Sequence, residues 1–440
     1  MIIDCKHQLA DIEVYYDVCI IGGGPAGIAL ALELSDQDYN VCLVESGGLK
    51  INNTNQRLNK IKNIGLPYED LSVQRGRFLG GSTNFWGGNC IPMDSVDFKP
   101  CKGRRNFYWP FPHATLEPYV LKAQSLLGIS SCSFGNELLR KLDLPIINKV
   151  NNRLFEWKAW QFCDFPFRFG DKFYKHLSTS EQITLYLNVN FVDFTIPEGE
   201  SKAKSAVIKN LSGKSGFINA SNFVLACGGI ENSRILLNLV DSKTLKIEKK
   251  QHSIGKYFAE HPNATIGYLK GKAALSAYNK HKIQYLEGGK EIKPGLGISA
   301  NLQEELGLLN GMVSVWPVPI ENSAITRVKL LLYLIRKREF GFKFIINMFF
   351  VVPGVVSLLP HVIHRLKGGV VNTPHRTDIF EVRLMAETVP NRCSEVCLID
   401  ERDCLGMKMA SLSWKLSRQD RLNFSSIANL AKKHFEKDAN

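Results

Sequence analysis

The strongest structural signal in the chain is the sequence YDVCIIGGGPAGIALALELS at residues 16–35. It opens with an apolar run that is typical of a buried strand and ends at three glycines. The rest has helical character, with Pro25 in the first turn, where the missing N–H of proline costs least. A second apolar run, VCLVES at residues 41–46, follows and contains an acid at its end. These pieces predict a β-α-β unit.

The turn between the first strand and the helix has the spacing Gly-x-Gly-x-x-Gly, formed by Gly22, Gly24 and Gly27. The first glycine allows a tight turn, the second lets the backbone approach a pyrophosphate, and the third lets the helix pack closely on the strand. The helix N-terminus adds N–H donors and a favourable dipole. Glu45 ends the second strand, where a carboxylate can accept hydrogen bonds from a ribose diol. Strand, motif, helix, strand and acid together predict a dinucleotide site.

Two further glycine-rich segments have chemical meaning only in combination with the first. RGRFLGGSTNFWGGN, residues 75–89, could lie with its backbone against a large planar cofactor, and by itself could equally be a surface loop. LACGGIENSRILL, residues 225–237, reads as a strand that passes through glycines into a helix. Alone, it would indicate only another βα turn.

In this order, the three segments resemble those of the glucose-methanol-choline (GMC) family of FAD-dependent oxidoreductases. The similarity is closest to the sugar-oxidising branch with pyranose oxidase and the large subunit of fructose dehydrogenase. IGKYFAEHP, residues 254–262, is similar to the phrase that follows the second glycine segment in the family. AETVPNRCSEVCLIDERDCLG, residues 386–406, looks like a stretch of its substrate domain. The resemblance covers nearly the whole chain, and the order of the five motifs makes it specific.

The resemblance implies an FAD site. The first glycine motif would hold the pyrophosphate, Glu45 would bind the adenosine ribose, and Val192 would meet adenine through its backbone. The flavin and ribityl region and the return to the dinucleotide would involve Gly80, Gly81, Ser82, Thr83, Trp86, Gly87, Asn89, Ala226 and Gly228. Relatives with covalent flavin carry a histidine just before the Trp86 position. This chain has Phe85 there, so we expect non-covalent FAD.

The expected fold class is α/β, with a Rossmann-like FAD-binding domain and a second, α+β substrate domain built on an antiparallel sheet. The FAD-binding domain would comprise residues 1–90 and 180–262, and the substrate domain residues 91–179 and 263–440. Between residues 183 and 223, β-rich pieces separated by polar turns predict an antiparallel meander followed by a buried strand.

The residue that would accept the substrate proton is missing from the matched positions. In the family it is a histidine, partnered by histidine or asparagine, in a final segment that has no counterpart before the ending HFEKDAN. Hydride transfer from an alcohol to flavin needs such a base for the hydroxyl proton. We therefore assign no catalytic residue, and we expect His261, in the Glu-His-Pro phrase, to be structural. A truncated sequence, a second chain that completes the site, or an inactive protein would each explain the gap.

Composition narrows the remaining choices. Of 440 residues, 45% are hydrophobic and 22% charged, which is ordinary for a globular protein and excludes a disordered or collagen-like chain. The net charge of +13 is compatible with anionic ligands, but the basic residues are dispersed without a recognition motif, so nucleic-acid binding is disfavoured. Eleven cysteines without paired spacing predict reduced thiols and no metal site. No signal peptide is evident at the start, so a cytoplasmic location is expected.

One apolar stretch leaves a membrane association open. Residues 344–364 contain no Asp, Glu, Lys or Arg and follow a basic cluster that begins at Arg327. Prolines interrupt the stretch, so buried helices or a lid over an apolar cavity are favoured. Peripheral attachment through residues 327–364, with the basic cluster on anionic head groups, is the second interpretation, and a membrane span the third.

The sequence thus predicts an FAD-dependent oxidoreductase that oxidises an alcohol group, with a sugar or sugar derivative as the expected substrate. One alternative is a flavin-binding homologue or subunit without turnover of its own. The other is a nicotinamide-linked enzyme that uses the same glycine motif. The second and third glycine segments argue against the latter, since they are typical of FAD proteins.

Overall fold

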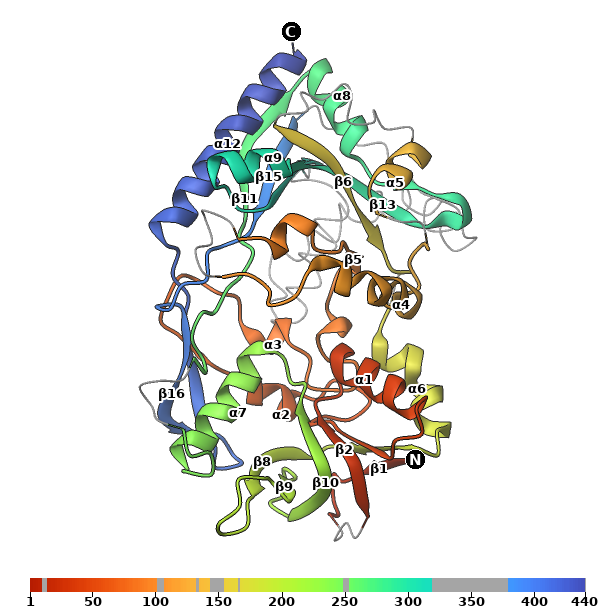
Figure 1. Cartoon of the computed structure of the whole chain (residues 1–440), viewed down its shortest axis with the longest axis vertical. Helices are drawn as coiled ribbons and strands as arrows, with labels where there is room; N and C mark the ends of the chain where they lie inside the picture. The colour runs from red at the N-terminus through yellow and green to blue at the C-terminus, as the bar shows by residue number, and fades with distance from the viewer. Residues whose placement is uncertain are drawn as a thin grey trace, which may run out of the picture.

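Two large sheets, one in each lobe of an elongated molecule, organise the computed structural model (Figure 1). The N-terminus lies in the lobe built on the first sheet, and the C-terminus lies at the far end of the other lobe. The structure describes residues 1–9, 14–100, 107–131, 134–142, 154–164, 167–247, 253–318 and 379–439.

The first sheet has seven strands in the order β1-β7-β3-β2-β10-β9-β8. Neighbours from β1 to β10 run parallel, and β9 and β8 continue the sheet in antiparallel fashion. The strands are β1 (Ile2–Asp4), β2 (Tyr15–Ile21), β3 (Val41–Val44), β7 (Ile183–Leu187), β8 (Asn190–Thr195), β9 (Ser205–Lys209) and β10 (Ser215–Leu225). The mixed α/β class with a Rossmann-type sheet is as predicted.

Helices cover both faces of the parallel strands, so alternate side chains of β2 pack in opposite directions. Val18 and Ile20 pack in one cluster with α1 (Pro25–Ser35) and α6 (Phe169–Thr179). Cys19 and Ile21 pack in another with α7 (Gly229–Asp241). Burial on both faces explains the continuous apolar runs in the sequence. It also leaves Cys19 fully buried as a free thiol, as expected.

The sequence-based meander is wrong for its first piece. β7 is a parallel strand between β1 and β3, and all five of its residues are buried. A strand buried on both faces belongs in the interior of a parallel sheet. The chain then turns at Asn188, which has φ +59°, and only β8, β9 and β10 form the antiparallel part.

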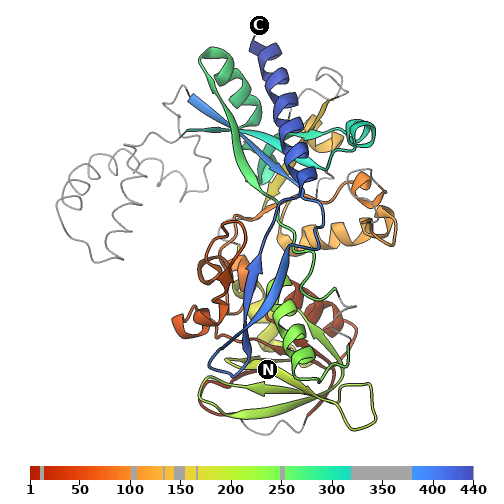
Figure 2. The same ribbon diagram turned by 90° about the vertical axis from the view of Figure 1, so that its left-hand side faces the viewer.

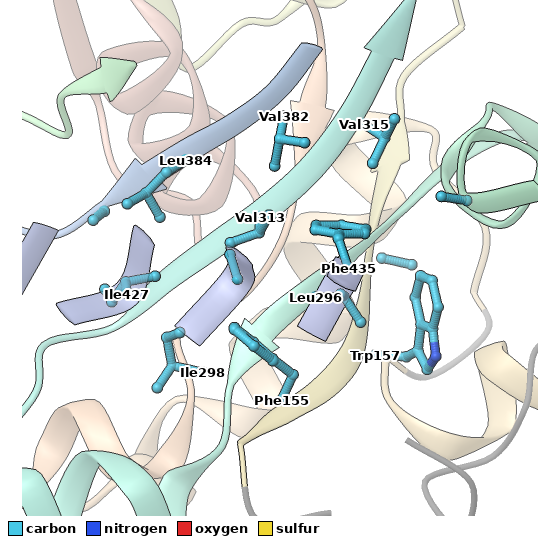
Figure 3. Packing of buried hydrophobic residues seen from close by; sticks show 14 of the residues in the cluster. Phe155, Trp157, Leu296, Ile298, Val313, Val315, Val382, Leu384, Ile427 and Phe435 are labelled. Carbon is cyan, nitrogen blue, oxygen red and sulfur yellow. The ribbon is translucent and has the colours of Figure 1, made fainter. Parts of the chain in front are cut away.

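The second sheet is antiparallel, with the order β11-β15-β14-β13-β6-β5 and β12 paired to β13. Its strands are β5 (Asn89–Cys90), β6 (Phe155–Phe162), β11 (Asn263–Lys270), β12 (Gln284–Tyr285), β13 (Glu291–Ile298), β14 (Gly311–Pro317) and β15 (Ile379–Ala386). One face packs on α8 (Lys272–His281) and α12 (Arg418–Ala439). Figure 3 shows Ile427 and Phe435 of α12 against Val313 and Leu296 of the sheet.

A third, small sheet connects the lobes. It consists of β16 (Glu395–Arg402), β17 (Lys408–Ser413) and β4 (Lys62–Asn63). The β16–β17 hairpin lies beside α7, and the chain then returns to the second lobe as α12 (Figure 2). Residues 386–406, which the resemblance assigns to a substrate domain, therefore include a strand that packs against the dinucleotide-binding lobe.

The remaining α-helices are short or lie at the surface. They are α2 (Asn53–Gln56), α3 (Leu71–Gln74), α4 (Glu117–Leu127), α5 (Asn136–Lys141) and α9 (Ala300–Leu306). In the part of the chain that the structure describes, no helix is both long and apolar enough to cross a membrane. The basic and apolar stretch at residues 327–364 lies outside the described residues.

Candidate dinucleotide site

The first glycine motif stands at the carboxyl end of β2, between β3 and β10, and its glycines have three different surroundings. Gly22 has φ +117°, and a Cβ there would lie 2.6 Å from the carbonyl oxygen of Ala226. A Cβ on Gly27 would lie 2.0 Å from the carbonyl oxygen of Gly22. A Cβ on Gly24 would meet no atom closer than 4.0 Å. Two glycines are thus needed for packing, and Gly24 leaves its space open for a ligand.

Glu45 braces the glycine turn. Its Oε2 accepts a hydrogen bond of 2.9 Å from the Gly23 N–H, and its Oε1 accepts one of 2.9 Å from the Gly47 N–H and one of 3.1 Å from the Ser46 hydroxyl. Burial raises the pKa of Glu45. A carboxylate has about four lone-pair sites, so Oε2 retains one for a ribose hydroxyl. The acid therefore shapes the turn as well as facing the cavity.

The second glycine segment packs backbone to backbone on the first. The Gly80 N–H donates to the Gly23 carbonyl at 2.8 Å, and a Cβ on Gly81 would lie 2.9 Å from the Gly24 Cα. Both glycines have positive φ, +92° and +55°. Thr83 holds this turn, because its hydroxyl donates to the Gly80 carbonyl at 2.6 Å. Segments separated by more than fifty positions thereby form one surface.

The third glycine segment, residues 225–237, also packs next to the first glycine motif. The Ala226 N–H donates to the Ile21 carbonyl at 2.7 Å, and Gly228, with φ +83°, is the N-cap of α7. The N-termini of two helices, α1 and α7, therefore lie close to the same glycine segments. Such termini present unpaired N–H groups and favour anions.

These segments surround one cavity of about 680 Å³. Ligand sites commonly fall between about 300 and 1,000 Å³. The cavity is lined by seven of the residues assigned to the cofactor, which are Gly22, Gly24, Glu45, Gly81, Ser82, Ala226 and Gly228. The other seven, which do not line it, are Gly27, Gly80, Thr83, Trp86, Gly87, Asn89 and Val192.

Among the assigned residues that do not line the cavity, Trp86, Asn89 and Val192 contact other parts of the protein. Trp86 donates through Nε1 to the Phe167 carbonyl at 3.0 Å, and Asn89 lies in β5 paired with Phe162. Val192 packs half-buried on the cluster beneath the sheet, while its neighbours Asn190 and Phe191 line the cavity. A bulge in the pairing of β8 with β9 falls between Phe191 and Asp193.

A buried ionic network that the sequence did not predict supports the cavity wall. Glu231 lies 2.8 Å from Arg77 and is held by Arg234 through two hydrogen bonds of 3.0 and 2.8 Å. Arg234 also donates to Asp403 at 3.0 Å. Although burial opposes ionisation, the two guanidinium groups lower the pKa of Glu231 to about 2. The four groups come from three distant segments, so no local pattern could reveal the network.

The segment from Gly255 to Glu260 forms another part of the cavity wall. Tyr257 in this segment has φ +61°, a conformation that costs a bulky residue about 1–3 kcal/mol. The phrase IGKYFAEHP, residues 254–262, supports the family resemblance, but the resemblance assigned none of its residues to the FAD site. Its backbone strain is visible only in the structure.

The residues present fit a dinucleotide. Asn190 is 4% exposed and lines the cavity, and its Oδ1 has no hydrogen-bond partner among the described residues. An unpaired buried acceptor costs about 1–3 kcal/mol, and an amino group of a bound base would satisfy it. The open space at Gly24 and the two helix N-termini suit a pyrophosphate. In the described part of the chain, no three His, Cys, Asp or Glu side chains gather as metal ligands.

Several solved structures are similar along most of this chain. A formate oxidase variant from Aspergillus oryzae has a TM-score of 0.48 at 15% identity, over 97% of this chain and 82% of that one. Pyridoxine 4-oxidase from Mesorbium loti has a TM-score of 0.48 at 13% identity, over 96% and 80%. A fungal aryl-alcohol oxidase has a TM-score of 0.47 at 10% identity, over 96% and 82%.

At the level of sequence, the chain matches one known protein over a short stretch and one family model over more than half of its length. An (R)-mandelonitrile lyase-like protein of Arabidopsis thaliana is 38% identical over 85 residues, which are 16% of this chain and 15% of that protein. The match thus spans less than a sixth of this relative's length. The family model described as pyridine nucleotide-disulphide oxidoreductase matches residues 16–252, which is more than half of the chain and includes all three glycine segments. The chain therefore belongs to the pyridine nucleotide-disulphide oxidoreductase family.

Proposed function

We propose that this protein is an FAD-dependent oxidoreductase of the GMC type that oxidises an alcohol group by hydride transfer to flavin. One observation carries the proposal: three glycine segments from separate parts of the chain meet around one cavity with Glu45 at its edge. A sugar or sugar derivative is the expected donor, from the resemblance to sugar-oxidising members. Bound flavin would supply the hydride acceptor, and the protein would supply binding, orientation and proton transfer.

Each part of the cavity has a role in this proposal. Gly24 and the N-termini of α1 and α7 would hold the pyrophosphate, Glu45 a ribose hydroxyl, and Asn190 the adenine amino group. The Gly81–Ser82 turn would bring its backbone against the ribityl and flavin part. Gly80, Thr83 and Trp86 would act one step removed, by holding that turn in place.

The flavin is expected to bind without a covalent link. Phe85 occupies the position of the flavin-linked histidine in relatives with covalent FAD, and its ring packs against Phe78 at a centroid distance of 5.9 Å. A phenyl ring offers no nucleophile for a bond to flavin. Precipitation of the purified protein with trichloroacetic acid should therefore release all yellow colour into the supernatant. Flavin that stays with the pellet and travels with a peptide in mass spectrometry would contradict this expectation.

Reduction of bound flavin by alcohols tests the activity. We expect the purified protein to show flavin absorbance near 450 nm, which a donor such as D-glucose, D-fructose or benzyl alcohol bleaches under anaerobic conditions. Flavin that none of a broad panel of alcohols reduces would favour the alternative, a flavin-binding homologue without turnover of its own. Absence of flavin together with tight NADH binding would favour a nicotinamide-linked enzyme.

A further inference from the structure

Two cysteines lie side by side where the second glycine segment ends. Cys90 in β5 is the register partner of Gln161 in β6. The Cys163 N–H donates to the Gly88 carbonyl at 2.9 Å, so Cys163 continues this antiparallel pairing opposite Gly88. Side chains two positions apart on an extended chain share a face. Cys90 and Cys163 are therefore diagonal neighbours on one face of the pairing.

The two thiols meet across Gly88. A Cβ on Gly88 would lie 3.5 Å from the Cys163 Cβ, which places the Cys163 side chain beside this glycine. The Cys90 Sγ donates to the Gly88 carbonyl oxygen at 3.7 Å. Gly88 has no side chain to separate the cysteines, and their thiols form a hydrogen bond with each other. Backbone pairing thus holds the two sulfur atoms together.

The two cysteines differ in access and in acidity. Cys163 is buried, at 6% exposed, whereas Cys90 is partly exposed. The hydrogen bond from Cys163 lowers the pKa of Cys90 and outweighs the opposing effect of burial. The same hydrogen bond, together with burial, raises the pKa of Cys163. Because the thiolate is the nucleophilic form of cysteine, Cys90 is the member of the pair that an oxidant meets first.

Other cysteines of the chain separate the effects of contact and access. Cys19 and Cys42 are register partners on β2 and β3, and their side chains form a hydrogen bond, but both are fully buried. Cys393 and Cys404 are exposed free thiols. The pair at the end of the second glycine segment combines thiol contact with access from solvent. This combination is typical of redox-sensitive cysteines that have a resolving partner.

We propose that Cys90 and Cys163 are a redox-active thiol pair that reacts with hydrogen peroxide and closes to a reversible disulfide. The Cys90 thiolate attacks the peroxide, so that an S–O bond forms, the O–O bond breaks and one water leaves. The Cys163 sulfur then attacks the resulting sulfenic acid, so that the S–S bond forms, the S–O bond breaks and a second water leaves. The two thiols lose two electrons and two protons, and one peroxide becomes two waters. A dithiol reductant restores both thiols by exchange.

The disulfide would tie the end of the second glycine segment to β6 of the second lobe. β5 and β6 are joined by only two residue pairs, so a small shift that brings the sulfurs into bonding distance disturbs few backbone hydrogen bonds. The cross-link would close a loop from residue 90 to residue 163, which restricts the unfolded chain. We therefore expect the oxidised protein to melt about 5 °C above the reduced protein.

Peroxide titration of the purified wild-type protein tests the proposal. The protein is reduced, freed of reductant, treated with increasing hydrogen peroxide, quenched in acid, blocked with N-ethylmaleimide and mapped by mass spectrometry without reduction. We expect a peptide that links Cys90 to Cys163 to appear at a lower dose than any oxidation of Cys393 or Cys404, and dithiothreitol to abolish it. If the two exposed cysteines are oxidised while this linked peptide never forms, the proposal is wrong.

Three variants assign the roles within the pair. Cys163→Ser should stop at the sulfenic acid of Cys90, which dimedone captures, and should lose the rise in melting temperature on oxidation. Cys90→Ser should leave Cys163 reduced at the same dose, whereas the control Cys393→Ser should form the disulfide as the wild type does. A sulfenic acid on Cys163 in Cys90→Ser would contradict the assigned order. The wild-type map decides the proposal even if replacement of the buried Cys163 impairs folding, and it does not depend on the proposed alcohol oxidation.

Discussion

Gly24→Ala is expected to yield a folded protein that no longer holds its flavin. The Cβ would meet no protein atom closer than 4.0 Å, and Gly24 has φ −83°, which alanine adopts without strain. The free energy of unfolding of the apoprotein should therefore change by less than about 1 kcal/mol. In the loaded protein the same methyl group would occupy the space where the backbone approaches the pyrophosphate. We expect FAD affinity to fall by about 100-fold or more, equivalent to about 3 kcal/mol.

Fluorescence quenching of FAD and thermal unfolding with and without FAD measure the two effects separately. Because a ligand that binds only the folded state stabilises it, FAD should raise the melting temperature of the wild type and not that of Gly24→Ala. Gly27→Ala provides the contrast, since its Cβ would lie 2.0 Å from the Gly22 carbonyl oxygen and should cost about 3 kcal/mol or more. Gly267→Ala, in β11, controls for glycine replacement itself, because Gly267 has no atom within 4 Å of an added Cβ, has no positive φ and does not line the cavity. If Gly24→Ala binds FAD with unchanged affinity, the pyrophosphate does not bind at this turn.

Arg234→Met is expected to destabilise the first lobe strongly. Arg234 is 5% exposed and bonds Glu231, Asp403 and the Lys408 carbonyl, so it joins α7 to the β16–β17 hairpin. Its removal leaves two partly buried carboxylates without their main partner, for which about 3–5 kcal/mol is typical. Lys122→Met is the matched control, because the Lys122–Glu33 pair has a similar distance of 2.7 Å but both side chains are at least half exposed. Exposed pairs contribute only about 0–1 kcal/mol.

The pH dependence of unfolding provides a second signature of this network. The folded-state pKa of Glu231 is about 2, below the unfolded value of about 4.3. A group with a depressed folded pKa stabilises the protein above its unfolded pKa, and this contribution is lost as pH falls toward the folded pKa. Wild-type stability should therefore decline between about pH 4.3 and 2, and Arg234→Met should show a smaller decline. Urea unfolding at several pH values measures this. Equal declines in both proteins would mean that Arg234 does not hold the charge of Glu231.

The local part of the site was predictable from sequence because its determinants are adjacent in the chain. Residues 16–46 contain a strand, turn, helix, strand and acid in order, and the structure has β2, α1 and β3 there. The backbone geometry of such a turn explains why glycine is required at Gly22, for the tight turn, and at Gly27, for close packing of the helix on the strand. By contrast, β1 and β7 were not recognised as members of the parallel sheet, because β7 pairs with β1 on one side and β3 on the other, and both pairings join residues more than a hundred positions apart.

The sequence by itself determined the α/β class, the glycine turn and the acid that follows it, because these depend on local backbone conformation and on the periodicity of apolar residues. Only the tertiary structure brought Arg77, Glu231 and Arg234 into one ionic network in the wall of the cavity. Whether a charged side chain is a solvated surface group or a member of a site depends on the neighbours it acquires through long-range packing.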